Sequence, residues 1–204
     1  MGKKYVSLLS SKTANFEDLI VRLEKKYDIN GYHFDIMDGH FVKNFAFNAE
    51  IIKALRNKTK LIFDVHLEIQ EPELFFDMFI DAGSNMITFH PQNCKNLNRA
   101  LRYLKAKNII TSVALDLEHS IDYIKEYLGL IDNVLVLSVQ PGFGMQKFNG
   151  AVMKKIGALK KLIKEKELIT TIGIDGGITE EIEEDLFDKG VDILIVGSSL
   201  LNSL

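Results

Sequence analysis

The sequence predicts an α/β protein folded as a (β/α)8 barrel, and three observations lead to this prediction. Short apolar segments alternate with longer segments of helical spacing along the chain. Several of the short segments are nearly all apolar, as expected for parallel strands covered on both faces. Eight such strand–helix units follow one another within 204 residues. Units this numerous and even favour a closed barrel, and a doubly wound open sheet is the alternative.

The expected strands are short and rich in apolar side chains. Successive side chains of a strand point to opposite faces, so residues two apart point the same way. In chain order, the strands are expected over residues 5–9, 32–36, 61–66, 85–89, 109–115, 133–138, 168–174 and 191–196.

Each expected strand is followed by a segment in which apolar residues recur at helical spacing. Pro72 suits the first turn of the third helix and Gly83 suits its end. Ser120 is a candidate N-cap of the fifth helix. The helices are expected over residues 15–27, 49–56, 71–82, 97–107, 120–128, 151–166 and 180–189. Only residues 199–204 remain for a short eighth helix.

Composition and charge limit the classes of function. Hydrophobic residues make up 47% of the chain and charged residues 26%, and residues 1–204 are expected to form a single domain. The net charge of −3 provides no basic field for nucleic acid. No apolar run approaches the ~20 residues of a membrane span, and the first residues lack the apolar core of a signal peptide. Cys94 is the single cysteine, so a cytoplasmic protein without an internal disulfide is expected.

Histidine and aspartate residues lie near the carboxyl ends of three expected strands. His33 and Asp35 are two apart on one strand, His66 ends a second, and Asp175 ends a third. In a (β/α)8 barrel the active site lies at the carboxyl ends of the strands. These residues therefore predict a metal or acid–base site, whereas a structural role is expected for His90.

Glycine-containing loops follow strands six, seven and eight. They are Gly142-Phe143-Gly144, Gly176-Gly177 and Gly197-Ser198. Glycine lets backbone N–H groups approach an anion closely, and phosphate sites of these barrels are commonly built after strands seven and eight. Because the three clusters contain no lysine, backbone amides are expected to do most of the phosphate binding.

Four segments resemble ribulose-phosphate 3-epimerases. They are residues 33–42 (HFDIMDGHFV), 64–67 (DVHL), 138–144 (SVQPGFG) and 175–177 (DGG). The resemblance runs over nearly the whole chain in the same order. It implies a TIM-type barrel that acts as a metal-dependent isomerase, interconverting D-ribulose 5-phosphate and D-xylulose 5-phosphate in the pentose phosphate pathway of carbohydrate metabolism. It also implies a homo-oligomer.

Carried over by motif, the resemblance gives roles to individual residues. His33, Asp35, His66 and Asp175 would bind one divalent ion, and a mixed nitrogen and oxygen set fits Zn, Fe, Mn or Co. Asp35 and Asp175 would be the catalytic pair, moving the C3 proton on opposite faces of a metal-stabilised enediolate. The substrate-binding residues would be Ser7, His66, Gly142, Phe143, Gly144, Met145, Gly176, Gly177, Gly197 and Ser198.

The sequence also departs from the family pattern. Val6 stands where the family usually has Pro, Gln140 where it has Asn, and Met145 interrupts its second glycine pair. Glu68 and Leu137 each stand where the family usually has Met. The family's methionines help line the apolar part of the site, whereas the four expected metal and proton residues are intact.

Two alternatives remain open at this point. The first is a hexulose-phosphate 3-epimerase that acts on a substrate such as allulose 6-phosphate. The second is a non-catalytic barrel that binds a phosphate compound, and the intact cluster of four polar residues argues against it.

Overall fold

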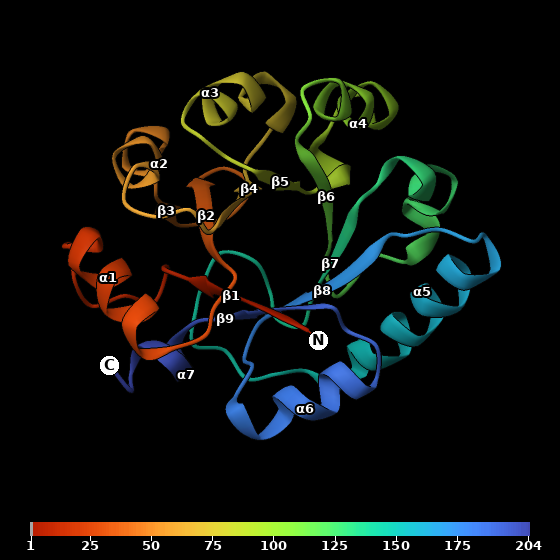
Figure 1. Ribbon diagram of the computed structural model, residues 1–204. Coiled ribbons are helices and arrows are strands. Elements are labelled where there is room, and N and C mark those ends of the chain that lie inside the picture. The colour runs from red at the N-terminus through yellow and green to blue at the C-terminus, as the bar shows by residue number, and fades with distance from the viewer. Residues whose placement is uncertain (1) are drawn as a thin grey trace.

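The computed structural model describes residues 2–204 and confirms the predicted barrel (Figure 1). Within these residues eight parallel strands form the wall, which closes because the first strand pairs with both the second and the last. The wall strands are β1 (Lys3–Ser7), β2 (Gly31–Asp38), β4 (Ile62–Glu68), β5 (Met86–Phe89), β6 (Ile110–Leu115), β7 (Asn133–Leu137), β8 (Thr171–Asp175) and β9 (Ile193–Val196). A short strand, β3 (Phe45–Ala46), pairs antiparallel with β2.

Helices surround the wall on its outer side (Figure 1). They are α1 (Phe16–Lys26), α2 (Ala49–Arg56), α3 (Phe76–Asp81), α4 (Leu97–Ala106), α5 (Met153–Glu165), α6 (Glu180–Asp188) and α7 (Ser198–Leu201). Asn15, Asn48 and Asn96 cap α1, α2 and α4, because each side chain accepts a backbone hydrogen bond from the first turn. The last helix is as short as predicted. None of the helices in the described part of the chain is long and apolar enough to cross a membrane.

Two expected helices differ from the prediction. The helix expected over residues 120–128 is wrong, since two 3-10 helices, η3 (Ile121–Tyr123) and η4 (Lys125–Leu130), stand there. Ser120 does cap η3, but the next four residues, Ile121 to Ile124, are β-branched, acidic or aromatic and have poor helix propensity. The helix expected over residues 71–82 is divided into η1 (Pro72–Leu74) and α3. Further 3-10 turns are η2 (Pro91–Asn93) and η5 (Gly150–Val152).

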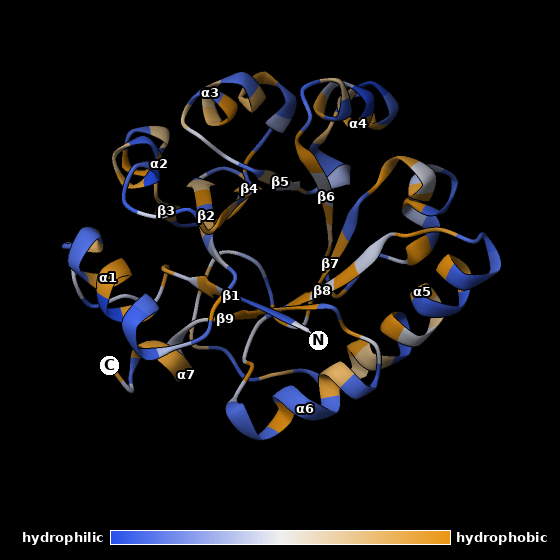
Figure 2. Ribbon diagram, in the orientation of Figure 1, coloured by the Kyte–Doolittle hydropathy of each residue, from blue (hydrophilic) through white to orange (hydrophobic). Residues whose placement is uncertain are grey.

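Apolar side chains fill two regions. The larger region lies between the outer faces of the strands and the helices, and Figure 2 shows hydrophobic residues along the strands and on the helices around them. A smaller cluster comes from β1, β5, β7 and β9: Tyr5, Met86, Leu135, Leu137, Ile193 and Ile195. A Cβ atom on Gly31 would lie 2.8 Å from the Tyr5 ring, so glycine makes room for that ring on β2. The polar residues described below stand closer to the carboxyl ends of the strands.

Arg56, the last residue of α2, joins segments at the amino-terminal ends of β4 and β5. Its guanidinium donates to the carbonyls of Thr59 (2.7 Å) and Leu61 (2.9 Å) and to Asn85 Oδ1 (2.9 Å). It also lies 3.8 Å from the centre of the Phe63 ring. One side chain therefore satisfies three acceptors from two connections of the barrel.

We predict that Arg56→Met lowers the free energy of unfolding by about 1–3 kcal/mol, because the three acceptors lose a charged donor. Urea denaturation of the two proteins measures the difference. The exposed Arg99 on α4 provides the control, and Arg99→Met should change stability by less than about 0.5 kcal/mol. Equal stability of the two variants would contradict the joining role of Arg56.

Candidate active site

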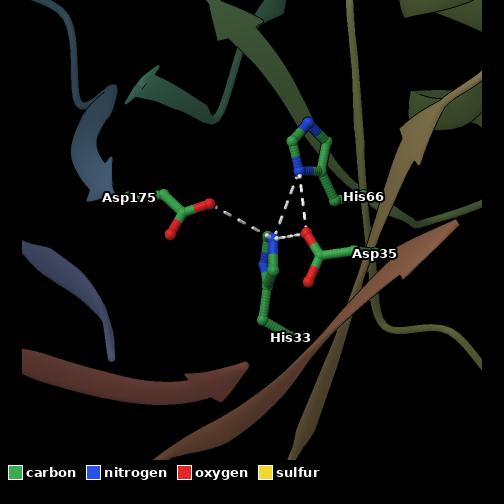
Figure 3. A group of neighbouring side chains, drawn as sticks. All are labelled: His33, Asp35, His66 and Asp175. Atoms are coloured by element: carbon green, nitrogen blue, oxygen red, sulfur yellow. Dashed lines mark hydrogen bonds and ion pairs between the residues drawn. The ribbon is translucent and has the colours of Figure 1, made fainter. Parts of the chain in front are cut away.

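His33, Asp35, His66 and Asp175 come together at the carboxyl ends of β2, β4 and β8 (Figure 3). Asp35 and His66 are partners in the parallel ladder of β2 and β4. These two strands each run two residues beyond the ends expected from the sequence, to Asp38 and Glu68. The structure thus assembles the four residues that the sequence grouped.

The polar atoms of the four side chains lie around His33 Nε2 (Figure 3). This atom lies 3.2 Å from Asp35 Oδ1, 3.2 Å from His66 Nδ1 and 4.0 Å from Asp175 Oδ2, and His66 Nδ1 lies 3.5 Å from Asp35 Oδ1. Around a metal with bonds of about 2.1 Å, neighbouring ligand atoms of a tetrahedral site are about 3.4 Å apart. The cluster could therefore hold one divalent ion after small side-chain movements.

Asp64 orients the His33 ring from its far side. His33 Nδ1 lies 2.8 Å from Asp64 Oδ2, and the other oxygen of Asp64 accepts from the Thr88 hydroxyl at 2.7 Å. A proton on Nδ1 is thereby held by a carboxylate, which leaves Nε2 facing the cluster. Asp64 had no predicted role, although its position two residues before His66 places both on one face of β4.

His90 orients the His66 ring in a comparable way. The two Nε2 atoms lie 3.0 Å apart, and His90 Nδ1 lies 2.8 Å from Asp116 Oδ1. Burial lowers the pKa of His90 to about 4, so the ring is neutral at pH 7. With its proton toward Asp116, His90 accepts from His66 and leaves His66 Nδ1 free for the cluster. The structural role expected for His90 is thus exerted directly on a residue of the site.

The surroundings of His33 favour positive charge. Complete burial by itself lowers the pKa of His33, but the carboxylates of Asp35 and Asp64 outweigh burial and raise that pKa well above its usual value. A proton or a metal ion at Nε2 is stabilised by the same two carboxylates. The negative charge around His33 therefore favours a cation at the same place where the distances between the polar atoms allow one.

The two aspartates of the cluster differ in their ionisation. Burial by itself would raise the pKa of Asp35, but contacts with His33 and His66 lower it, and Ser7 Oγ donates to Asp35 Oδ2 at 2.9 Å. Burial raises the pKa of Asp175 to about 7. The nearby charge of His33 lowers this pKa, whereas that of Asp35 raises it. The Asp175 side chain keeps 22% of its surface exposed. A pair of carboxyls with separated pKa values is the usual arrangement for acid–base chemistry.

A cavity of about 470 Å³ opens above Asp35 and Asp175. Most of the expected substrate-binding residues line it: Ser7, Gly142, Phe143, Gly144, Met145, Gly177, Gly197 and Ser198. His66 is completely buried and Gly176 is turned away, with its carbonyl accepting from the Ser138 hydroxyl, so neither lines the cavity. Lys147 also lines the cavity. It was not predicted as a substrate-binding residue because it lies just outside the three glycine clusters.

The loop over residues 139–147 forms one side of the cavity, and hydrogen bonds join it to Asn44 and Glu68. The carbonyl of Gly142 accepts from Asn44 Nδ2 at 2.8 Å, and its N–H donates to Glu68 Oε1 at 3.3 Å. Gly142 has a φ of +102°, a conformation that glycine adopts without strain. Phe143 and Met145, in contrast, expose 54% and 74% of their surface.

Glu68, which stands where the family usually has Met, is a third carboxyl at the cavity, and no role was predicted for it. It is the last residue of β4 and is 3% exposed. Burial, followed by the nearby charges of Asp35 and Asp175, raises its pKa well above the usual value. No donor from residues 2–204 reaches Glu68 Oε2.

Solved structures and characterised proteins agree with this description. The barrel superposes on a mutant tryptophan synthase α-subunit from Pyrococcus furiosus with a TM-score of 0.73 and 12% identity, covering 99% of this chain and 91% of that one. It superposes on KGPDC from Streptococcus mutans with a TM-score of 0.70 and 14% identity, covering 99% and 90%. At these identities the likeness concerns the fold alone.

Sequence relatives are more specific. The chain is 33% identical over 201 residues to ribulose-phosphate 3-epimerase of Bacillus subtilis, covering 98% of this chain and 92% of that protein. It is 35% identical over 194 residues to the enzyme of the same name from Chlamydia muridarum, covering 94% and 85%. Residues 4–201 match the model of the ribulose-phosphate 3 epimerase family. The chain therefore belongs to the ribulose-phosphate 3-epimerase family.

Proposed function

We propose that this protein inverts C3 of a ketose phosphate, with D-ribulose 5-phosphate as substrate and D-xylulose 5-phosphate as product. The observation that carries the proposal is the pair of carboxyls, Asp35 and Asp175, at one cavity and within 4.8 Å of two histidines. Family membership supports the same reaction. Residues 1–204 would act as a single catalytic domain of a cytoplasmic homo-oligomer in the pentose phosphate pathway.

His33, Asp35, His66 and Asp175 would hold one divalent ion, for which Zn, Fe, Mn and Co are candidates. When bound, such an ion supplies Lewis-acid stabilisation of the negative charge that develops on the C2 and C3 oxygens. Asp64 and His90 would fix the two histidine rings so that their free nitrogens face the ion.

Asp35 and Asp175 would move the proton. They stand on β2 and β8, with β1 and β9 between those strands, so a sugar at the barrel mouth can lie between the two carboxyls. The C3 proton is acidic because C3 is next to the C2 carbonyl. One carboxylate removes this proton from one face, and the other carboxyl returns a proton to the opposite face. The sugar itself need not turn over.

The phosphate would be bound at the loops after β8 and β9. Gly177, Gly197 and Ser198 line the cavity there, and Lys147 from the neighbouring loop supplies a cation. Backbone amides near glycine can approach an anion closely. This placement leaves the polar cluster free for the carbonyl end of the sugar.

The first test of the proposal concerns the metal. We expect purified protein to contain about one divalent ion per chain, and His66→Ala to lose most of it because one of four ligands is gone. Inductively coupled plasma mass spectrometry measures the content, with the exposed His40→Ala as control. Chelation should abolish turnover of ribulose 5-phosphate, and adding back one of the candidate ions should restore it. Full activity of metal-free protein would exclude the proposed metal role.

The second test concerns the two aspartates. Asp35→Asn and Asp175→Asn should each reduce kcat on the order of 10²–10⁴-fold, as expected for a lost acid–base group. The double variant should be hardly slower than either single variant, because each loss stops the same relay. Asp188→Asn, on the exposed side of α6, is the control. Metal content must be measured in each variant, because both aspartates are also proposed ligands.

Solvent deuterium gives an independent readout of the same relay. Each base exchanges its proton with water, so wild-type protein should introduce deuterium at C3 during turnover. A metal-replete Asp175→Asn protein should exchange C3 hydrogen in one epimer without forming the other. Epimerisation by this variant at the wild-type rate would show that Asp175 is not the second base.

The third test concerns the loop over residues 139–147, which we propose to be a lid over the phosphate. Closure would bury Phe143 and Met145, which now expose most of their apolar surface. Hydrogen exchange measured by mass spectrometry should show slower exchange of this loop when ribulose 5-phosphate or inorganic phosphate is present. Unchanged exchange in the loop, alongside measurable binding of either compound, would rule out the lid.

A further inference from the structure

Glu68 is one of the residues that line the cavity, and one of its carboxyl oxygens is buried without a hydrogen-bond donor from the described residues. Its Oε1 accepts from the Gly142 N–H at 3.3 Å, whereas its Oε2 has no donor among residues 2–204. Leaving a buried acceptor unpaired is energetically unfavourable, and more so for a charged group. Since Glu68 lines the cavity, the missing donor can come from a bound ligand.

The position of Glu68 in the barrel indicates which part of a ligand it meets. β4 lies across the barrel from β8, with β2, β1 and β9 between them on one side and β5, β6 and β7 on the other. The loops after β8 and β9 carry Gly177, Gly197 and Ser198, to which the phosphate is assigned above. Glu68 therefore faces the end of the cavity opposite the proposed phosphate site.

A 2-ketose 5-phosphate has a hydroxymethyl group at the end of its carbon chain that is remote from the phosphate. With the phosphate at β8 and β9 and C3 between Asp35 and Asp175, the C1 hydroxyl would point toward β4. We propose that Glu68 Oε2 forms a hydrogen bond with this C1 hydroxyl, which makes Glu68 a specificity-determining residue for ketose phosphates with an oxygen on C1. This inference rests on the proposed function.

A different occupant is a second metal ion, because ligand atoms of His66, Glu68 and His90 also lie within 4.8 Å of one another. The Nε2 atoms of the two histidines already face each other at 3.0 Å, and each satisfies the other. An ion there would have to break that contact, which orients His66 toward the first cluster. The hydroxyl of a sugar needs no such change.

The test compares D-ribulose 5-phosphate with its 1-deoxy analogue, which lacks only the C1 hydroxyl. Wild-type protein should favour ribulose 5-phosphate by on the order of 10–100-fold in kcat/KM, as expected for one hydrogen bond to a buried carboxyl. Glu68→Met, which fills the same volume without a polar atom, should reduce this preference to less than about threefold. Glu68→Gln keeps both a hydrogen-bonding group and the acceptor for Gly142, and should retain most of the preference.

The outcomes separate this inference from the proposed function. An unchanged preference in a folded, metal-replete Glu68→Met protein would overturn the role of Glu68 while leaving the epimerase intact. A second metal ion in wild-type protein that is lost in Glu68→Met would overturn it in favour of a metal ligand. Wild-type protein that converts neither ketose phosphate would overturn the proposed function itself. Thermal unfolding of each variant verifies that the comparison is made on folded protein.

Discussion

The hydrogen bond between His33 and Asp64 is the interaction on which the candidate active site depends. His33 Nε2 is the atom around which the other three side chains gather, and its direction is set by the Asp64 carboxylate on the opposite side of the ring. Asp64 is in turn held by Thr88 on the next strand. The site is therefore oriented by residues deeper in the barrel, where strand pairing leaves little freedom to move.

Three carboxyls stand near one another at the cavity, and each is accommodated differently. Asp35 stays ionised because two histidines and Ser7 contact it. Asp175 and Glu68 have raised pKa values, principally because they are buried and then because they lie near other carboxylates. A cation in the cluster would reduce the electrostatic repulsion among these carboxylates. The proximity of the three carboxyls favours a bound cation. Together with burial, it also raises the pKa of Asp175 to about 7, so this carboxyl can exchange a proton near neutral pH.

Local patterns in the sequence were sufficient for the strands, most helices and the four residues of the cluster. His33 and Asp35 share a face by simple alternation, and barrel closure brings the strand ends together. The contacts of His90 with His66 and of His90 with Asp116 depend on the register between neighbouring strands, which periodicity does not reveal. The short 3-10 helices after Ser120 were not predicted because the apolar spacing there is helical, whereas residues 121–124, directly after the cap, have poor helix propensity.

The loop over the cavity is positioned from the opposite side of the barrel. Asn44 donates to the carbonyl of Gly142 and Glu68 accepts from its N–H, so the two peptide groups that flank its Cα are held by two separate segments. The positive φ of Gly142 sets the direction of both groups, and a Cβ atom there would lie 2.8 Å from the side chain of Val42. Because Glu68 accepts from the loop with Oε1 while its Oε2 has no donor among the described residues, a ligand that bonded to Oε2 would meet the same carboxyl that holds the loop. The proposed contact with the C1 hydroxyl and the hydrogen bond to the loop would thus share a single carboxyl.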